Sequence, residues 1–152
     1  MPYLTPLNSK SVKTVSQKIE ERWGTTFSRE YVWYMHTKEK DIYLINSDIR
    51  AIPYETLNVN NMGLYVANLD NHDTVRLSIE GSQILGPDAT RNIIELDERQ
   101  VAKWMRGHDI EYCHEDGYVI VRSGHDYMGC GRIKDNILLN FVPKGRRIQS
   151  AL

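Results

Sequence analysis

Apolar residues recur along this chain at two different spacings, which predict helices in some places and strands in others. Four apolar residues from Val12 to Trp23 follow one another at spacings of three and four, as on one face of a helix. The pattern predicts a helix over residues 10–23, with Ser9 as its N-cap and Gly24 as its end. Strands are predicted in this half at residues 31–35, 41–45 and 63–67.

The second half has its own series of predicted strands around one helix. Asp97 and Gln100 form a capping-box pattern, which predicts a helix reaching Arg106. The predicted strands lie at residues 75–79, 92–96, 118–122, 127–133 and 136–142. Strands this close together around a single helix favour a small mixed barrel. The two glycines of Gly129-Cys-Gly131 are expected to form a turn between two of these strands.

A polar stretch at residues 69–73 separates the two series, and we place a domain boundary there. The predicted organisation is α+β: an N-terminal domain of a helix and an antiparallel sheet over residues 1–73, and a β-rich domain over residues 74–152. A length of 152 residues suits either one ordinary domain or two small ones. We expect the second to fold alone, because roughly 75 residues are within the workable size range.

Composition narrows the setting in which the protein works. The chain is 41% hydrophobic, which supports a real core, and no apolar run is long enough for a membrane-spanning helix. The N-terminus lacks the basic-then-apolar order of a signal peptide. Two cysteines are too few for a disulfide framework. We therefore expect a soluble, cytoplasmic protein.

The end of the chain concentrates positive charge. Between Gly131 and Arg147 there are five basic residues and one acid, Asp135, in a chain whose formal net charge is −1. A basic edge on a small β-rich domain favours a polyphosphate partner, above all RNA. A basic edge that serves only solubility is the alternative.

Three segments carry a resemblance to a known family: Tyr118-Val-Ile-Val-Arg122, Met128-Gly-Cys-Gly-Arg132 and Leu139-Asn-Phe-Val-Pro-Lys-Gly-Arg-Arg147. In this order they resemble the end of the PUA domain attached to Sun-type RNA cytosine-5 methyltransferases. Arg76-Leu-Ser-Ile-Glu-Gly-Ser-Gln-Ile-Leu-Gly86 resembles the opening strand and turn of that domain. The first half is similar only in arrangement to the pre-PUA domain of small stand-alone archaeal PUA proteins.

The resemblance implies a PUA-like pseudo-barrel that holds RNA between the turn after its first strand, its first helix and its final strand. Carried onto this chain, the implied RNA-binding residues are Gly81, Ser82, Gln83, Arg132, Lys144, Arg146 and Arg147. Glycine would allow close backbone approach, the serine and glutamine would hydrogen-bond base edges or a 2′-hydroxyl, and the arginines would grip phosphates. Glycines that serve only turns, and a Tyr127 that packs in the core rather than on a base, remain the alternatives.

Metal binding and catalysis fit the sequence less well. His108, Cys113, His114, His125 and Cys130 lie in one stretch, but no Cys-x-x-Cys or paired-His spacing occurs. We expect no metal site and no cofactor. The Pro-Cys and Thr-Cys motifs of Sun-type methyltransferases are missing around both cysteines, and Gly129-x-Gly131 is no dinucleotide fingerprint. We therefore expect no enzyme activity.

The sequence thus predicts a non-catalytic protein that binds structured RNA such as tRNA or rRNA. It would assist a separate RNA-modifying enzyme or ribosome biogenesis, and would have no membrane partner. The alternative is a protein–protein adaptor that docks on an RNA methyltransferase or ribosomal protein. Its surface would come from the aromatic residues of the first half: Tyr31, Trp33, Tyr34, Tyr43, Tyr54 and Tyr65.

Overall fold

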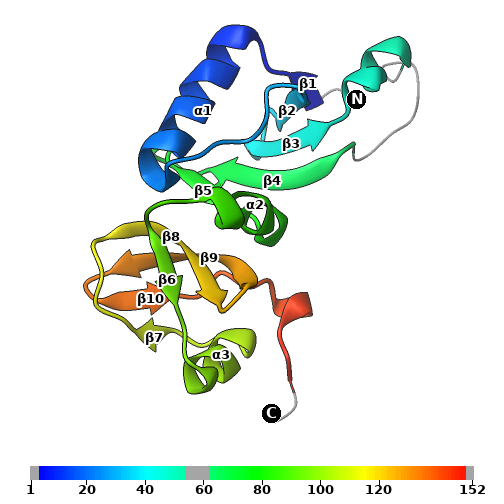
Figure 1. Cartoon of the computed structure of the whole chain (residues 1–152). Helices are drawn as coiled ribbons and strands as arrows, with labels where there is room; N and C mark the ends of the chain where they lie inside the picture. Colours follow the sequence, from blue (N-terminus) through cyan, green and yellow to red (C-terminus); the bar gives the residue numbers. More distant parts are fainter. Residues whose placement is uncertain (1–3, 54–61, 150–152) are drawn as a thin grey trace.

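A computed structural model describes residues 4–53 and 62–149 as two five-stranded sheets with helices beside them (Figure 1). The predicted α+β class is confirmed. The first sheet contains β1 (Leu4–Pro6), β2 (Val32–His36), β3 (Asp41–Ile45), β4 (Leu64–Leu69) and β5 (Val75–Leu77). The second contains β6 (Ile93–Glu95), β7 (Ile110–Glu111), β8 (Gly117–Ser123), β9 (Asp126–Lys134) and β10 (Ile137–Leu139). The helices are α1 (Ser9–Trp23), α2 (Ile79–Leu85) and α3 (Glu98–Met105), with short 3-10 turns at η1 (Ser47–Ala51), η3 (Gly86–Asp88) and η4 (Lys144–Arg146).

The first sheet is antiparallel throughout, in the order β1-β2-β3-β4-β5. Helix α1 packs on one of its faces through its apolar stripe, as the spacing predicted. Its N-cap is Asn8 rather than Ser9, because the Asn8 side chain accepts a hydrogen bond from the Ser11 N–H at 2.8 Å. Gly24 ends the helix in the left-handed conformation, at φ 82°.

The predicted domain boundary at residues 69–73 falls inside this sheet. Strand β5 pairs with β4 through Leu69↔Val75 and Ala67↔Leu77, so the polar stretch between them is a hairpin turn. The strand that was expected to open the second domain therefore completes the first sheet. Whether residues 1–73 and 74–152 fold separately stays a prediction.

The residues expected to form a turn after that strand form helix α2 instead. Ser78 caps this helix, with its hydroxyl oxygen accepting from the Gly81 N–H at 2.9 Å. Serine at an N-cap satisfies one of the free amides of a first turn. The cap lets the chain turn directly from β5 into α2.

The second sheet has the order β6-β8-β9-β10-β7 and curls on itself; only the β6–β8 pair is parallel. The capping box of Asp97 and Gln100 at α3 is confirmed. Gly129 and Gly131 do not form a turn, because both lie within β9, and the turn between β8 and β9 is at Gly124 and His125. Gly129 has a φ of +129°, a conformation that favours glycine.

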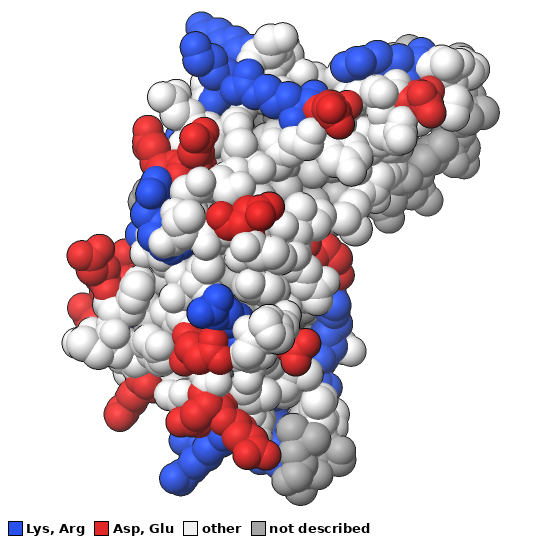
Figure 2. Space-filling view, viewed as in Figure 1, with Lys and Arg blue, Asp and Glu red and all other residues white. Residues whose placement is uncertain are grey.

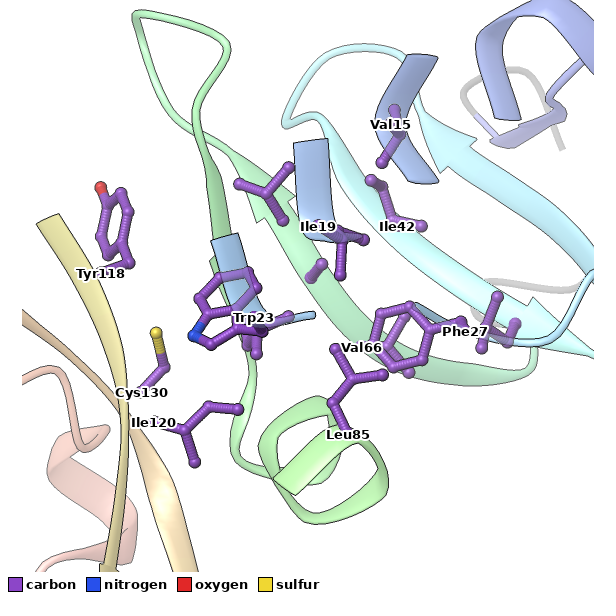
Figure 3. Packing of buried hydrophobic residues seen from close by; sticks show 14 of the residues in the cluster. Val15, Ile19, Trp23, Phe27, Ile42, Val66, Leu85, Tyr118, Ile120 and Cys130 are labelled. Carbon is purple, nitrogen blue, oxygen red and sulfur yellow. The ribbon is translucent and has the colours of Figure 1, made fainter. Parts of the chain in front are cut away.

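The two sheets share one apolar cluster. Ile19 and Trp23 of α1 pack with Ile120 of β8 and Cys130 of β9, and all four are nearly inaccessible to solvent (Figure 3). Contacts of this density fix the relative position of the packed elements. The first and second halves of the chain are therefore joined through a common core.

Polar contacts lock the same junction. Arg91, just before β6, donates from Nε to the Glu21 carbonyl at 2.9 Å and from Nη2 to the Glu20 carbonyl at 2.8 Å. Both carbonyls belong to the last turn of α1, and the Glu20 carbonyl also accepts from the Gly24 N–H at 2.8 Å. In return, Arg22 donates from Nε to the Tyr118 carbonyl at 2.7 Å.

Among the residues that the structure describes, no helix has the length and apolar character needed to span a bilayer. Among the same residues, no three His, Cys, Asp or Glu side chains are grouped as a metal ion would require.

Candidate nucleic-acid interface

The C-terminal segment, residues 140–148, is anchored against the end of α3. The Asn140 Nδ2 donates to the Trp104 carbonyl at 2.8 Å, and its Oδ1 accepts from the Val142 N–H at 2.8 Å. The Ile148 N–H donates to the Met105 carbonyl at 2.8 Å. A segment without long secondary structure is thus held at both ends, so the backbone that carries its basic residues is anchored.

The four basic residues that the resemblance implies for RNA binding differ in their exposure to solvent and in their contacts within the protein. Lys144 and Arg146 are exposed on η4, and Arg146 forms an ion pair with Glu80 of α2 at 2.7 Å. Arg147 is half-buried; its Nε donates to the Val142 carbonyl at 2.9 Å, and its side chain lies over Gly107. Arg132 is exposed on β9, with its guanidinium 5.7 Å from the centre of the Tyr118 ring. Arg147 therefore braces the segment, whereas the other three present charge to solvent.

Gly81 and Ser82, which the resemblance implies for RNA binding, are buried in the structure. Gly81 faces β4 so closely that an added Cβ would lie 2.0 Å from the Val66 carbonyl oxygen. Ser82 is fully buried, and its hydroxyl donates to the Ser78 carbonyl at 2.8 Å. Both residues serve the packing of α2 on the first sheet, and their part in RNA binding stays a prediction.

Gln83, the next residue, is exposed, and it lies on the same surface as Arg146, one of the residues predicted to bind RNA. Gln83 and Arg146 line one hollow of about 450 Å³ between α2, α3 and the C-terminal segment. Tyr127 also lines this hollow, while its ring packs over Gly86. The fold therefore brings an amide and a guanidinium together, which can pair with a base edge and a phosphate respectively.

Charge on the surface is mixed. Figure 2 shows Lys and Arg gathered over α1 and along the edge formed by the C-terminal segment, with Asp and Glu between them. Mixed charge is consistent with the formal net charge of −1. Any attraction for a polyanion is therefore local to these patches and does not come from the whole molecule.

One arrangement of residues joins the two halves; sequence reasoning named Tyr43, Tyr65 and Arg132 singly but missed the arrangement. We call it the aromatic–arginine row; its members are Tyr43, Tyr65, Arg76, Phe141, Tyr118 and Arg132. The Tyr43 and Tyr65 rings are 5.6 Å apart, and the Arg76 guanidinium is 5.2 Å from the centre of the Phe141 ring. The Phe141 ring is 6.2 Å from that of Tyr118, which Arg132 covers in turn.

Arg76 is the link in this row between the first sheet and the second. It lies beside Tyr65, where its positive charge and a hydrogen bond oppose the rise that burial and Asp41 cause in the Tyr65 pKa. The alternation of Val75, Arg76 and Leu77 could have shown that Arg76 faces away from the core. Its contact with Phe141, 65 positions further along the chain, depends on how the two sheets pack and is not visible in the sequence.

Tyr118 is held in place by an acid of the β4–β5 turn. Its hydroxyl donates to Asp70 Oδ2 at 2.9 Å. Burial, and then this hydrogen bond to a carboxylate, raise the pKa of Tyr118 to about 12. Burial also tends to raise the pKa of Asp70, but hydrogen bonds from Thr74, His72 and Tyr118 outweigh it and the pKa is lowered. The pair therefore keeps a neutral phenol and a carboxylate at neutral pH.

Comparison with known families identifies part of this chain. Residues 91–148 match the family model described as the Methyltransferase RsmF PUA domain. The match begins just before β6 and ends with the C-terminal segment, and it confirms the resemblance for that region. It includes Arg132, Lys144, Arg146, Arg147 and Phe141 but not Gln83 or Arg76. No curated protein matches the chain.

Proposed function

We propose that this chain binds structured RNA without catalysing a reaction on it. The observation that supports this most is the anchored C-terminal segment, which exposes Lys144 and Arg146 on a region similar to the PUA domain of an RNA methyltransferase. Cations of this kind pair with phosphates and position a nucleic acid without reading its sequence. Gln83, which lines the same hollow as Arg146, adds one group that suits a base edge or a 2′-hydroxyl.

The two cysteines support a role without chemistry. Cys130 is buried, and burial raises its pKa to about 12, so its thiolate is scarce at neutral pH. Cys113 is exposed and follows Tyr112 rather than a proline or threonine. We infer that a separate enzyme modifies the RNA, with tRNA or rRNA as the substrate class and the cytoplasm as the setting.

The experiment compares two double variants that remove the same charge. Lys144→Gln/Arg146→Gln removes the exposed cations of the C-terminal segment, and Lys10→Gln/Lys13→Gln removes two exposed lysines of α1. Affinity for a labelled tRNA is measured by fluorescence anisotropy at several salt concentrations. The first variant should bind more weakly, and its plot of log K against log [salt] should be shallower by about two, because each lost phosphate contact contributes about 0.9.

The α1 variant should lose less affinity and keep most of the slope. Unchanged affinity and slope in the folded C-terminal variant would contradict the proposal, and so would equal losses in both variants. Arg147 is kept in both, since its bond to the Val142 carbonyl makes it part of the fold.

A protein–protein adaptor is the second candidate, and one surface favours it. Tyr31, Leu64 and Ile84 are large apolar side chains that remain exposed around a hollow of about 440 Å³. Of the aromatics expected to form such a surface, Trp33 and Tyr34 are buried, and Tyr54 is outside the described residues. The salt series separates the two candidates, because an adaptor would show little salt dependence toward RNA.

A further inference from the structure

We propose that the aromatic–arginine row binds a single-stranded stretch of RNA, with bases stacking on its rings and phosphates meeting its arginines. The inference rests on the proposed function and adds a second contact surface to it. Half of this surface, Tyr43, Tyr65 and Arg76, lies outside the region that matches the PUA family. It therefore assigns a role in RNA binding to the first half of the chain.

The order and spacing of the row suit a strand of unpaired nucleotides. At four contacts along the row, the distance between two ring centres, or between a guanidinium carbon and a ring centre, is 5.2 to 6.2 Å. The row runs from β3 across β4 and β5 to the second sheet. Proteins that hold single strands combine cations along the backbone with aromatic rings on which successive bases stack. Here both kinds of side chain occur in one continuous series.

The face of the first sheet that carries the row is free of α1. Ile42 and Leu44 of β3 belong to the cluster under α1, whereas Tyr43 between them packs with a separate cluster that includes Tyr34 and Val32. Tyr43 is paired with Tyr65 across β3 and β4, so the two rings share that second face. Both residues are half-buried.

A small hollow marks the centre of the row. It has a volume of about 160 Å³, and its walls include Tyr65, Arg76, Phe141 and Arg146. That volume is below the range of a site for a whole small-molecule ligand, and it suits a single ring system. Phe141 is 37% exposed, so part of its ring is open for stacking.

Members of the row have different roles. Phe141, Arg76 and Arg132 would contact RNA directly, because their side chains reach solvent. Tyr118 is buried, with its hydroxyl held by Asp70, so it is a positioning residue that supports the Phe141 ring. Arg146, which joins the hollow to the C-terminal segment, connects the row to the first proposed surface.

Unpaired RNA fits this arrangement better than an acidic peptide. Carboxylates would pair with the arginines but would leave the exposed ring unused. Bases have aromatic faces that stack on phenylalanine and on guanidinium groups alike. An acidic peptide is therefore an outcome that the experiment must be able to detect.

The test uses the full chain and two fluorescein-labelled probes, a twelve-nucleotide oligouridine and a blunt RNA hairpin. Phe141→Leu keeps an apolar side chain but removes the ring. It should weaken binding of the oligouridine by about 5- to 140-fold, the range expected for one lost base stack. Tyr31→Leu, at an exposed aromatic outside the row, is the matched control and should change nothing.

Three further measurements decide the interpretation. Phe141→Trp should keep or strengthen binding of the oligouridine, because a larger ring stacks at least as well. Photocrosslinking with 4-thiouridine should label peptides that contain Phe141 or Tyr65. Hairpin affinity should change little in Phe141→Leu, because the C-terminal segment would hold the duplex.

Unchanged oligouridine affinity in a folded Phe141→Leu variant would overturn the inference, and so would displacement of the RNA by polyglutamate at equal charge concentration. In both cases hairpin binding would survive if the proposed function is correct. If the wild-type chain bound neither probe, that result would instead refute the proposed function itself.

Discussion

Tyr118 shows how one residue can connect parts of the chain that lie far apart in sequence. Its backbone carbonyl accepts from Arg22 of α1, its hydroxyl donates to Asp70 of the β4–β5 turn, and Arg132 lies over its ring. Each contact comes from a different element. Changes in its protonation should therefore affect the stability of the whole molecule.

We predict that alkaline pH destabilises the protein through this residue. The folded-state pKa is about 12, whereas an unfolded tyrosine ionises near 10. Between these values the unfolded state loses its proton first, so the free energy of unfolding falls as the pH rises. Urea denaturation from pH 8 to pH 11.5 should show a steeper fall in the wild type than in Tyr118→Phe. Parallel curves would show that Tyr118 titrates as it does in the unfolded chain.

At the scale of elements, the sequence predicted those that have strong local signals. Helix α1 has an apolar stripe and a glycine stop, and α3 has a capping box, so both were predicted nearly to their ends. Helix α2 was missed because it has only seven residues and includes Gly81 and Ser82, which locally favour a turn. Its helical state comes from the Ser78 cap and from packing on β4, and neither shows in a local pattern.

The site divides in the same way. The cations of the C-terminal segment follow one another in the sequence, and so they were recognised. The row depends on contacts such as those of Arg76 with Phe141 and of Tyr118 with Asp70, which form only when the two sheets pack together. The sequence predicted surface roles for Tyr43, Tyr65 and Arg132 separately, but it assigned none to Arg76, Tyr118 or Phe141.

We predict that Gly81→Ala destabilises the protein by about 1–3 kcal/mol, the usual cost of overpacking a tight contact. The added methyl group would lie 2.0 Å from the Val66 carbonyl oxygen, and backbone cannot move aside as a flexible side chain can. Gly145→Ala is the control, because nothing lies within 4 Å of its added Cβ. Chemical denaturation of both variants should show a lower midpoint for Gly81→Ala alone. Equal midpoints would mean that α2 does not pack on β4 as described.

At the scale of the whole molecule, the common core argues against two independent folding units. A fragment of residues 74–152 would leave β5 without β4 and would expose Ile120 and Cys130, which α1 covers in the full chain. Apolar surface uncovered in this way removes the stabilisation that its burial gave. We therefore expect such a fragment, if it folds alone as its length suggests, to be less stable than the full chain.

We predict that this fragment unfolds at a lower urea concentration than the full chain and binds the dye ANS, which reports exposed apolar surface. The full chain, measured alongside, should show one cooperative transition and little dye binding. A fragment with the same midpoint as the full chain would show that the shared cluster contributes little, and that the boundary near residue 73 is a true domain limit.

The ion pair between Arg146 and Glu80 means that a carboxylate of the protein competes with RNA phosphates for this arginine. Arg146 already has an anionic neighbour, a carboxylate 2.7 Å away that belongs to the protein itself. A phosphate that takes this arginine must displace Glu80 or share the guanidinium fork with it, and a displaced carboxylate would have to be rehydrated next to a polyanion. Lone phosphate ions or sulfate would gain too little from one such exchange. A polymer that presents several phosphates at once, and contacts Lys144 as well, offsets that cost. Glu80 would therefore make the interface select long nucleic acids over small anions.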